Sequence, residues 1–224
     1  HPQSPEIVRR QQPLLGRVLS ALGNIRVHVP FDLRPLWVAQ EEQRRSALRQ
    51  PVPAEPAARL ERLGLNLANF YSELNNRGEE VRRRVLEDVQ AGLGLDVVGV
   101  IAPITGRGFI DLAIQFRNLA QPVFSAGLSD GQLTYLGYVA LRHFEDSTTV
   151  LAMDEPELHL HPALLTRCTW LFEALSKRHA VLLSTHSDSV LDVLSDPANQ
   201  VRTCELDENR ATQLRQLSPT ALAH

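Results

Sequence analysis

Two short apolar runs separated by a helical pattern constrain the fold of this 224-residue chain more than any other feature. Val150–Met153 and Ala180–Ser184 are almost wholly apolar, whereas Pro162–Ser176 between them repeats apolar residues at helical spacing. A short apolar run without alternation is typical of a strand buried on both faces of a parallel sheet. The strand–helix–strand order therefore predicts an α/β fold in which helices flank a parallel sheet.

Helical and antiparallel β patterns precede this region. Apolar residues recur at helical spacing in two stripes, from Leu60 to Leu74 and from Val81 to Leu93, so we expect helices within residues 57–93. Val97–Ala102 and Phe109–Phe116 are then predicted as strands joined by a turn. Apolar and polar residues alternate in the second strand, which predicts one buried and one solvent-exposed face. Residues 57–124 therefore form a predicted helical and β-hairpin subregion.

The first 56 residues carry too little apolar sequence to form a core of their own. An amphipathic stretch interrupted by Pro13 predicts a broken helix, Ile25–Val29 alternates as a short strand, and Gln40–Arg49 is polar and helix-prone. We expect residues 1–56 to be an N-terminal arm or partial lobe. The α/β core is expected to span residues 125–224.

Composition excludes several classes of protein. The formal net charge is −3, so no overall basic field attracts nucleic acid. Two cysteines cannot build a disulfide framework, and they lack the close pairing of a zinc site. No apolar run is long enough to span a membrane, and the chain does not open with a signal peptide. These features predict a cytoplasmic protein with no membrane partner.

Two adjacent carboxylates, Asp154 and Glu155, follow the first apolar strand directly. The carboxyl ends of parallel strands lie at the sheet edge where ligands bind in open α/β folds. Adjacent side chains on an extended backbone point in different directions, so one acid can hold hydrated Mg²⁺ while the other polarises an attacking water. By themselves, two acids after a strand are equally well explained as solvated residues.

Two further segments strengthen the case for phosphate chemistry. In Ser129–Gln132, which opens a predicted helix, Ser129 is a good N-cap and Gly131 allows the backbone to come close to a ligand. The N-terminus of a helix favours an anion such as phosphate. His186 follows the second apolar strand and can donate a hydrogen bond to a phosphoryl oxygen or to a hydrolytic water. Alone, each segment is more simply an ordinary capped helix or a loop histidine.

In combination, these segments resemble the motifs of ABC ATPases. Leu128–Gln132 resembles the signature motif, with an aspartate in place of the more usual glycine, and Val150–Glu155 resembles a Walker B strand with its catalytic glutamate. Glu157–Pro162 stands where the D-loop falls, and Thr185–Ser187 resembles the switch-histidine loop. The amino-acid sequences of these motifs are similar to those of the OLD/RecF/SMC-like group, often labelled AAA-type ATP-binding proteins. The resemblance covers residues 125–190.

The resemblance implies an ATPase that holds its nucleotide between the two heads of a homodimer, with ATP and Mg²⁺ as ligands. Asp154 would orient Mg²⁺, Glu155 would activate water and His186 would sense the γ-phosphate. The family serves DNA repair, DNA processing or anti-phage defence, so DNA and an effector nuclease domain or subunit are further expected partners.

Other implied roles act across the dimer seam. Ser129, Gly131 and Gln132 would contact the nucleotide bound by the partner head. His159 and His161 would line the D-loop near that seam.

One family motif, the Walker A loop GxxxxGK[ST], does not occur in these residues. The only lysine, Lys177, ends a predicted helix and follows no glycine-rich loop. The sequence also begins at His1 without an initiator methionine. We therefore expect the C-terminal portion of a P-loop NTPase, which alone forms no complete nucleotide site and hydrolyses ATP weakly or not at all.

Two other functions stay open at this stage. His159 and His161, with Asp154, Glu155 and His186 nearby, would suit a hydrolase dependent on zinc or manganese. Without a Walker A loop, the chain would also suit a non-catalytic scaffold or dimerisation fragment. The cationic run Arg82–Arg84 would meet DNA phosphates or, more simply, form a solvated helix surface.

Overall fold

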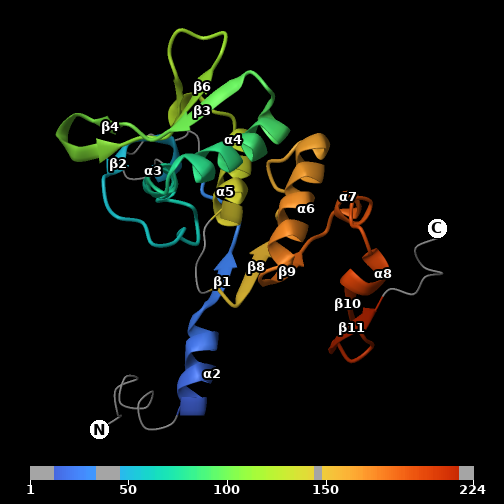
Figure 1. The fold of residues 1–224 in the computed structure, drawn as a ribbon. Coiled ribbons are helices and arrows are strands. Elements are labelled where there is room, and N and C mark those ends of the chain that lie inside the picture. Colours follow the sequence, from blue (N-terminus) through green and yellow to red (C-terminus); the bar gives the residue numbers. More distant parts are fainter. Residues whose placement is uncertain (1–12, 34–45, 144–147, 217–224) are drawn as a thin grey trace. The chain divides into compact units, whose positions relative to one another are not determined.

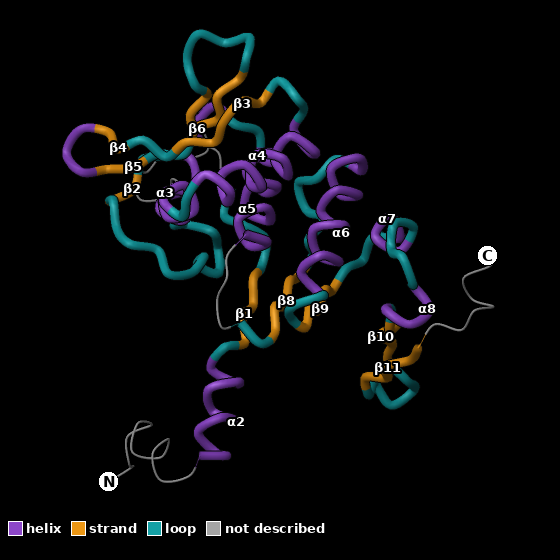
Figure 2. The backbone as a smooth tube through the Cα atoms, viewed as in Figure 1, coloured by secondary structure: helices purple, strands orange, loops and turns teal. Residues whose placement is uncertain are grey.

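The computed structural model describes residues 13–33, 46–143 and 148–216. The chain divides into two compact units, His1–Thr185 and His186–His224, and each is considered by itself. Figure 1 traces the elements along the chain, and Figure 2 distinguishes helices from strands. The predicted boundaries at residues 56 and 124 stay predictions.

A three-stranded parallel sheet lies at the centre of the first unit. Its strands are β1 (Ile25–His28), β8 (Val150–Asp154) and β9 (Ala180–Ser184), in the order β1-β8-β9. All neighbours are parallel, so the predicted α/β fold with a parallel sheet is confirmed. The strand nearest the N-terminus pairs with β8, which brings residues 25–28 beside the Asp154–Glu155 strand.

Two helices cover one face of this sheet. Figure 1 shows α5 (Asp130–His143) and α6 (Pro162–Ser176) lying side by side next to the strands. Leu151 and Met153 point to this covered face and are buried, as period-two alternation requires. Val27 and Leu182 belong to the opposite face and are 48% and 64% exposed.

Two other helices contribute to the same core, α3 (Leu67–Asn76) and α4 (Glu79–Leu93). The helical pattern had been expected to start at residue 57, but the helix begins ten residues later. Gly64 adopts a left-handed backbone with φ of 72°, and the Asn66 side chain accepts from Glu61 N at 2.9 Å and donates to Arg59 O at 2.9 Å. These turn contacts compete successfully with the helix.

The predicted strand Phe109–Phe116 is divided between two small antiparallel sheets. β5 (Phe109–Ile110) pairs with β2 (Val52–Pro53) and β4 (Ile104–Thr105). β6 (Ala113–Phe116) pairs with β3 (Val97–Ile101) and β7 (Val123–Phe124).

The expectation that one face of Phe109–Phe116 is exposed to solvent is also wrong. Asp111, at the break between β5 and β6, is only 6% exposed because Ser125 Oγ donates a 2.6 Å hydrogen bond to its carboxylate. Ala113 is fully buried. A polar residue therefore satisfies its hydrogen bond inside the core, which a simple alternation of apolar and polar residues does not anticipate.

The N-terminal quarter contributes to the core of the first unit. Phe31, Leu33 and Leu48 are buried, and the last belongs to the short helix η3 (Ala47–Arg49). The helix α2 spans Pro13–Gly23, and the part of the expected broken helix that precedes this proline lies outside the described residues. Most of the expected helix over residues 40–49 lies outside the described residues.

Short elements complete the description. The first unit also holds the single-turn helices η4 (Gly106–Gly108) and η5 (Ser125–Gly127). The second unit comprises α7 (Asp188–Leu191), α8 (Pro197–Gln200) and a hairpin of β10 (Arg202–Leu206) with β11 (Thr212–Gln216). Among the described residues, no helix is long and apolar enough to cross a membrane.

Candidate functional site

The two predicted carboxylates lie at the carboxyl edge of the parallel sheet. β8 ends at Asp154, which is exposed and stands in register with Ser184 at the end of β9. Ser184 Oγ donates a 2.5 Å hydrogen bond to Asp154 Oδ1. The neighbouring strand therefore orients this carboxylate.

Glu155 marks an abrupt change of backbone direction after the strand. Its φ is 45°, in the left-handed region that residues other than glycine seldom adopt. A 2.8 Å hydrogen bond from its backbone N–H to Ser184 O holds it there. Such strained conformations persist where the surrounding structure fixes them and are concentrated at functional sites. The Glu155 side chain is half-buried, whereas that of Asp154 is exposed.

Two hydrogen bonds tie the loop after Glu155 to its surroundings. Thr185 Oγ1 donates to Glu157 Oε1 at 2.7 Å, and the hydroxyl of Tyr138 on α5 donates to Pro156 O at 3.1 Å. Burial raises the pKa of Tyr138, so its phenol keeps its proton even in alkaline solution. His159 has a φ of 67°, a second left-handed residue within this short loop.

The two D-loop histidines have different surroundings. His161 is the N-cap of α6, and its Nδ1 accepts from Ala163 N at 3.4 Å. His159 Nδ1 lies 3.8 Å from Asp130 Oδ2. Among the described residues, no three His, Cys, Asp or Glu side chains are grouped so that they could hold a metal ion. The alternative of a zinc or manganese hydrolase, which would also use His186 of the second unit, stays a prediction.

The signature segment forms a capping box at the start of α5. Gln132 N donates to Ser129 Oγ at 3.2 Å, and Ser129 N donates to Gln132 Oε1 at 2.8 Å. Both predicted nucleotide-binding side chains therefore have an intramolecular role, as the simpler interpretation expected. Their nucleotide role stays a prediction.

Gly131 brings the signature segment against the D-loop. A Cβ atom at this position would lie 3.0 Å from His159 O, which is closer than most such contacts. Gly131 was expected to admit a ligand, whereas the close neighbour in this structure is the D-loop backbone. The fold thus brings together Ser129–Gln132 and the loop that follows Asp154 and Glu155.

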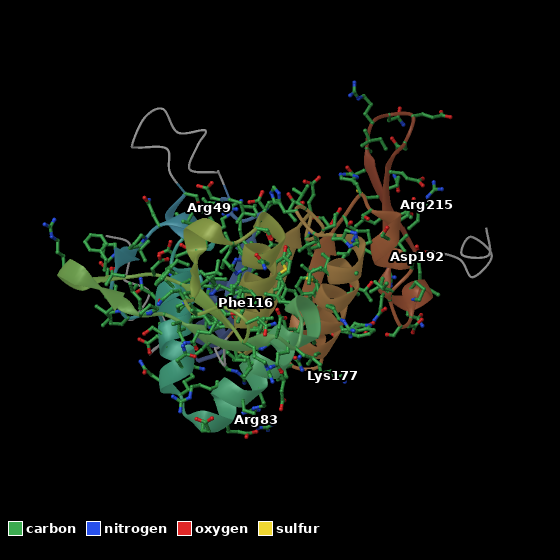
Figure 3. The ribbon with its side chains drawn as sticks, turned by 90° about the horizontal axis from the view of Figure 1, so that it is seen from above. Arg49, Arg83, Phe116, Lys177, Asp192 and Arg215 are labelled. Atoms are coloured by element: carbon green, nitrogen blue, oxygen red, sulfur yellow. The ribbon has the colours of Figure 1, made fainter. Side chains whose placement is uncertain are left out.

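Arg49 was not predicted as a site residue. It is only 7% exposed and forms an ion pair with Asp130 of the signature segment. Figure 3 labels Arg49 on its short N-terminal element. No local pattern marks it among the many arginines of the chain, because its partner lies 81 positions away.

Two features of the sequence remain, His186 and Lys177. His186 is exposed and is the first residue of the second unit, so its assigned role stays a prediction. Lys177 caps the C-terminus of α6 and precedes β9 by three residues, so it belongs to the amino edge of the sheet (Figure 3). The only lysine is therefore at the wrong end of the strands to contact phosphate near Asp154.

Two of the solved structures that are similar in fold to this chain illustrate the likeness. One, from work on ATP-driven dimerization and DNA-stimulated activation of SMC ATPases, is 14% identical with a TM-score of 0.50, and the match covers 63% of this chain and 86% of the other. The SMC head bound to the C-winged helix domain of ScpA is 13% identical with a TM-score of 0.50, over 80% of this chain and 55% of the other. No curated protein matches the chain.

A family model described as "AAA domain, putative AbiEii toxin, Type IV TA system" matches residues 14–192. This range includes β1, the signature segment, the Asp154–Glu155 edge and β9. It covers most of the chain and agrees with the parallel sheet flanked by helices. The chain therefore belongs to this AAA-domain family, and its fold is that of an ABC-type ATPase nucleotide-binding domain.

Proposed function

We propose that the protein binds and hydrolyses Mg-ATP at the carboxyl edge of the β1-β8-β9 sheet, with the nucleotide held between two copies. Glu155 acts as the base that activates water, Asp154 orients Mg²⁺ and His186 senses the γ-phosphate. Ser129, Gly131 and Gln132 act on the nucleotide of the partner copy. His159 and His161 line the seam between the copies.

The convergence of two motifs from distant parts of the chain carries this proposal. Gly131 approaches the His159 carbonyl, while Asp154 and Glu155 end the strand that leads into the same loop. If Asp154 and Glu155 were only solvated acids, nothing would require the start of α5 at Gly131 to lie against the loop that follows them. A hydrolytic edge and an anion-favouring helix N-terminus together suit phosphate chemistry.

The oxygen atoms at this edge suit magnesium. Mg²⁺ prefers hard oxygen ligands and retains several waters, so one exposed carboxylate is a sufficient anchor. Asp154 is exposed and oriented by Ser184, and both groups carry oxygen atoms. When bound, Mg²⁺ would neutralise phosphate charge, while Asp154 holds it and Glu155 accepts a proton from water.

We further propose that a phosphate-binding loop comes from polypeptide outside these 224 residues. Within the described part of the chain, β9 is paired on one edge only, by β8. The sheet face that carries Val27 and Leu182 is open and apolar, whereas parallel sheets are normally covered on both faces. A parallel strand beside β9, followed by a helix over this face, would cover both features and bring a phosphate loop to the same edge.

The cellular role follows from family analogy. The family description names a putative toxin of a type IV toxin–antitoxin system, which favours anti-phage defence over DNA repair or DNA processing. The finer placement in the OLD/RecF group, the cytoplasmic location and a DNA or nuclease partner belong to the same proposal.

Hydrolysis is tested by comparing this chain with the same chain extended through its phosphate-loop segment. We expect the extended protein to hydrolyse Mg-ATP and the 224-residue chain to be silent. Glu155→Gln in the extended protein should abolish turnover and accumulate an ATP-bound dimer, measured by light scattering. Glu208→Gln, an exposed acid of the second unit, is the matched control. Full turnover by the Glu155→Gln variant would overturn the assignment.

A non-catalytic scaffold is the second candidate, favoured by the lack of a lysine near the carboxyl edge. It predicts dimers that form equally with and without nucleotide. An ATP-independent dimer together with no hydrolysis by the extended protein would establish the scaffold.

A further inference from the structure

Arg49 is a buried arginine whose guanidinium contacts two segments far from it in the sequence, one at Leu33 and the other at Leu128–Asp130. Its Nε donates to Leu33 O at 3.2 Å and its Nη1 donates to Leu128 O at 2.7 Å. Its Nη2 forms the ion pair with Asp130. A buried guanidinium is costly unless it is paired, so these three contacts are the reason that Arg49 can stay inside.

Two of these contacts flank Ser129. Leu128 precedes this residue and Asp130 follows it, so one rigid, planar group holds the chain on both sides of the signature serine. The short helix that presents Arg49 is itself anchored, because Ser46 Oγ accepts from Leu48 N at 3.2 Å and donates to Asp32 O.

Asp130 also faces the D-loop. Its Oδ2 lies 3.8 Å from His159 Nδ1, while its Oδ1 is engaged by Arg49. The adjacent Gly131 lies against His159 O. The carboxylate therefore stands between the arginine and the D-loop, at the position where the signature motif more usually carries a glycine without any side chain.

We infer that Arg49 is a positioning residue that sets the signature segment and, through Asp130, its fit against the D-loop at His159. This inference rests on the proposed function, in which Ser129 and Gly131 act on nucleotide bound by the partner copy. Reacting groups misplaced by about 1 Å lose about a hundredfold in rate. A rigid brace on both sides of Ser129 is therefore expected to affect turnover more than nucleotide binding.

The first test needs no ATPase activity. Amide hydrogen exchange at Ser129 and Gln132, the two donors of the capping box, is measured in this chain. Arg49→Met should raise both exchange rates about tenfold, since the brace that limits opening of the segment is gone. Arg142→Met is the matched control, because it removes an ion pair with Asp88 at the other end of α5. Equal effects of the two variants at these amides would overturn the inference.

The second test uses the extended, ATP-hydrolysing protein. We expect Arg49→Met to lower kcat about tenfold with KM for ATP within about twofold, the pattern of a loss confined to the transition state. Arg49→Lys should recover part of kcat, because an ammonium can donate to Leu128 O and Asp130 but lacks the planar fork. An unchanged kcat in Arg49→Met would overturn the inference.

A second variant covers the case in which Arg49→Met does not fold. Asp130→Ala removes one partner and leaves both carbonyl contacts, and this side chain is 44% exposed. It should raise exchange at Ser129 and Gln132, and unchanged exchange would contradict the inference. If the extended wild-type protein hydrolyses no ATP, the proposed function fails, while the exchange measurements still decide the role of Arg49.

Discussion

The hydroxyl of Ser184 donates a 2.5 Å hydrogen bond to the carboxylate of Asp154 across the β8–β9 pair. This contact joins the residue expected to orient Mg²⁺ to the strand that leads toward Thr185 and His186. It makes Ser184 the residue whose removal should disturb the metal ligand with the least damage to the fold.

Ser184→Ala should lower the free energy of unfolding by about 1 kcal/mol or less, because both partners are exposed and water can replace the lost donor. In the extended protein, the Mg²⁺ concentration for half-maximal hydrolysis should rise several-fold. Denaturant unfolding and a Mg²⁺ titration of ATPase activity check these expectations. Ser176→Ala, which removes an exposed 2.8 Å hydrogen bond to Glu173 O at the end of α6, should lower the free energy of unfolding by a similar amount but leave the Mg²⁺ dependence unchanged.

Gly137→Ala tests how the N-terminal segment packs on α5. A Cβ at this position would lie 2.2 Å from Phe31 Cε2, and the Phe31 ring is only 5% exposed and cannot easily move away. Such overpacking should lower the free energy of unfolding by about 1–3 kcal/mol. Gly106→Ala is the control because nothing lies within 4 Å of its added Cβ. Denaturant midpoints that are equal for the two variants would contradict this packing.

The two cysteines should differ sharply in reactivity. Burial raises the pKa of the Cys168 thiol, whereas Cys204 is exposed. An alkylating reagent at pH 8 should therefore modify Cys204 quickly and Cys168 only after denaturation, as mass spectrometry of the labelled peptides would reveal. Rapid labelling of Cys168 in the folded chain would contradict its burial.

The same pKa shift predicts alkaline sensitivity. A thiol whose pKa is higher in the folded than in the unfolded chain stabilises the fold fully below the unfolded pKa, about 8.5. That contribution is lost as pH rises, because the unfolded chain releases its proton first. The free energy of unfolding should fall above pH 8.5, and Cys168→Ala should weaken this fall. Denaturant unfolding at pH 7, 9 and 10 measures both slopes.

The arginines of α4 should not form a DNA surface. Figure 3 labels Arg83, which forms ion pairs with Glu80 at 2.8 Å and with Glu87. Arg82 pairs with Glu79 at 2.5 Å, so acidic neighbours balance the cationic run. Arg83→Gln should leave the affinity for duplex DNA unchanged in a mobility-shift assay at low salt. A severalfold weaker complex would restore the DNA interpretation of this run.

Elements with one dominant periodicity were predictable from the sequence. Pro162–Ser176 and Ala180–Ser184 have the predicted bounds, because a proline start and a continuous apolar run leave few alternatives. The carboxylates after β8 were predictable for the same reason. The apolar run of β8 gives way to two acids at its carboxyl end, and in a parallel sheet that end lies at the ligand edge.

Other features depend on contacts between residues far apart in the chain. Asp111 is buried because Ser125 satisfies it, and the helix expected from residue 57 yields to the turn contacts of Asn66. Local periodicity cannot register a partner that is fixed only when the chain folds. Local periodicity also did not predict that β1 pairs with β8, since an alternating pattern predicts a strand but not which strand pairs with it.

The sequence by itself therefore predicted two carboxylates at the sheet edge, because that feature resides in the adjacent residues Asp154 and Glu155. Only the tertiary structure revealed Arg49, because the role that we infer for it depends on its contacts with Leu33, Leu128 and Asp130. A motif is a pattern of neighbouring residues, so it can be recognised from the sequence alone. A buried arginine that braces a loop 81 positions away is defined by its partners, and these meet only when the core forms.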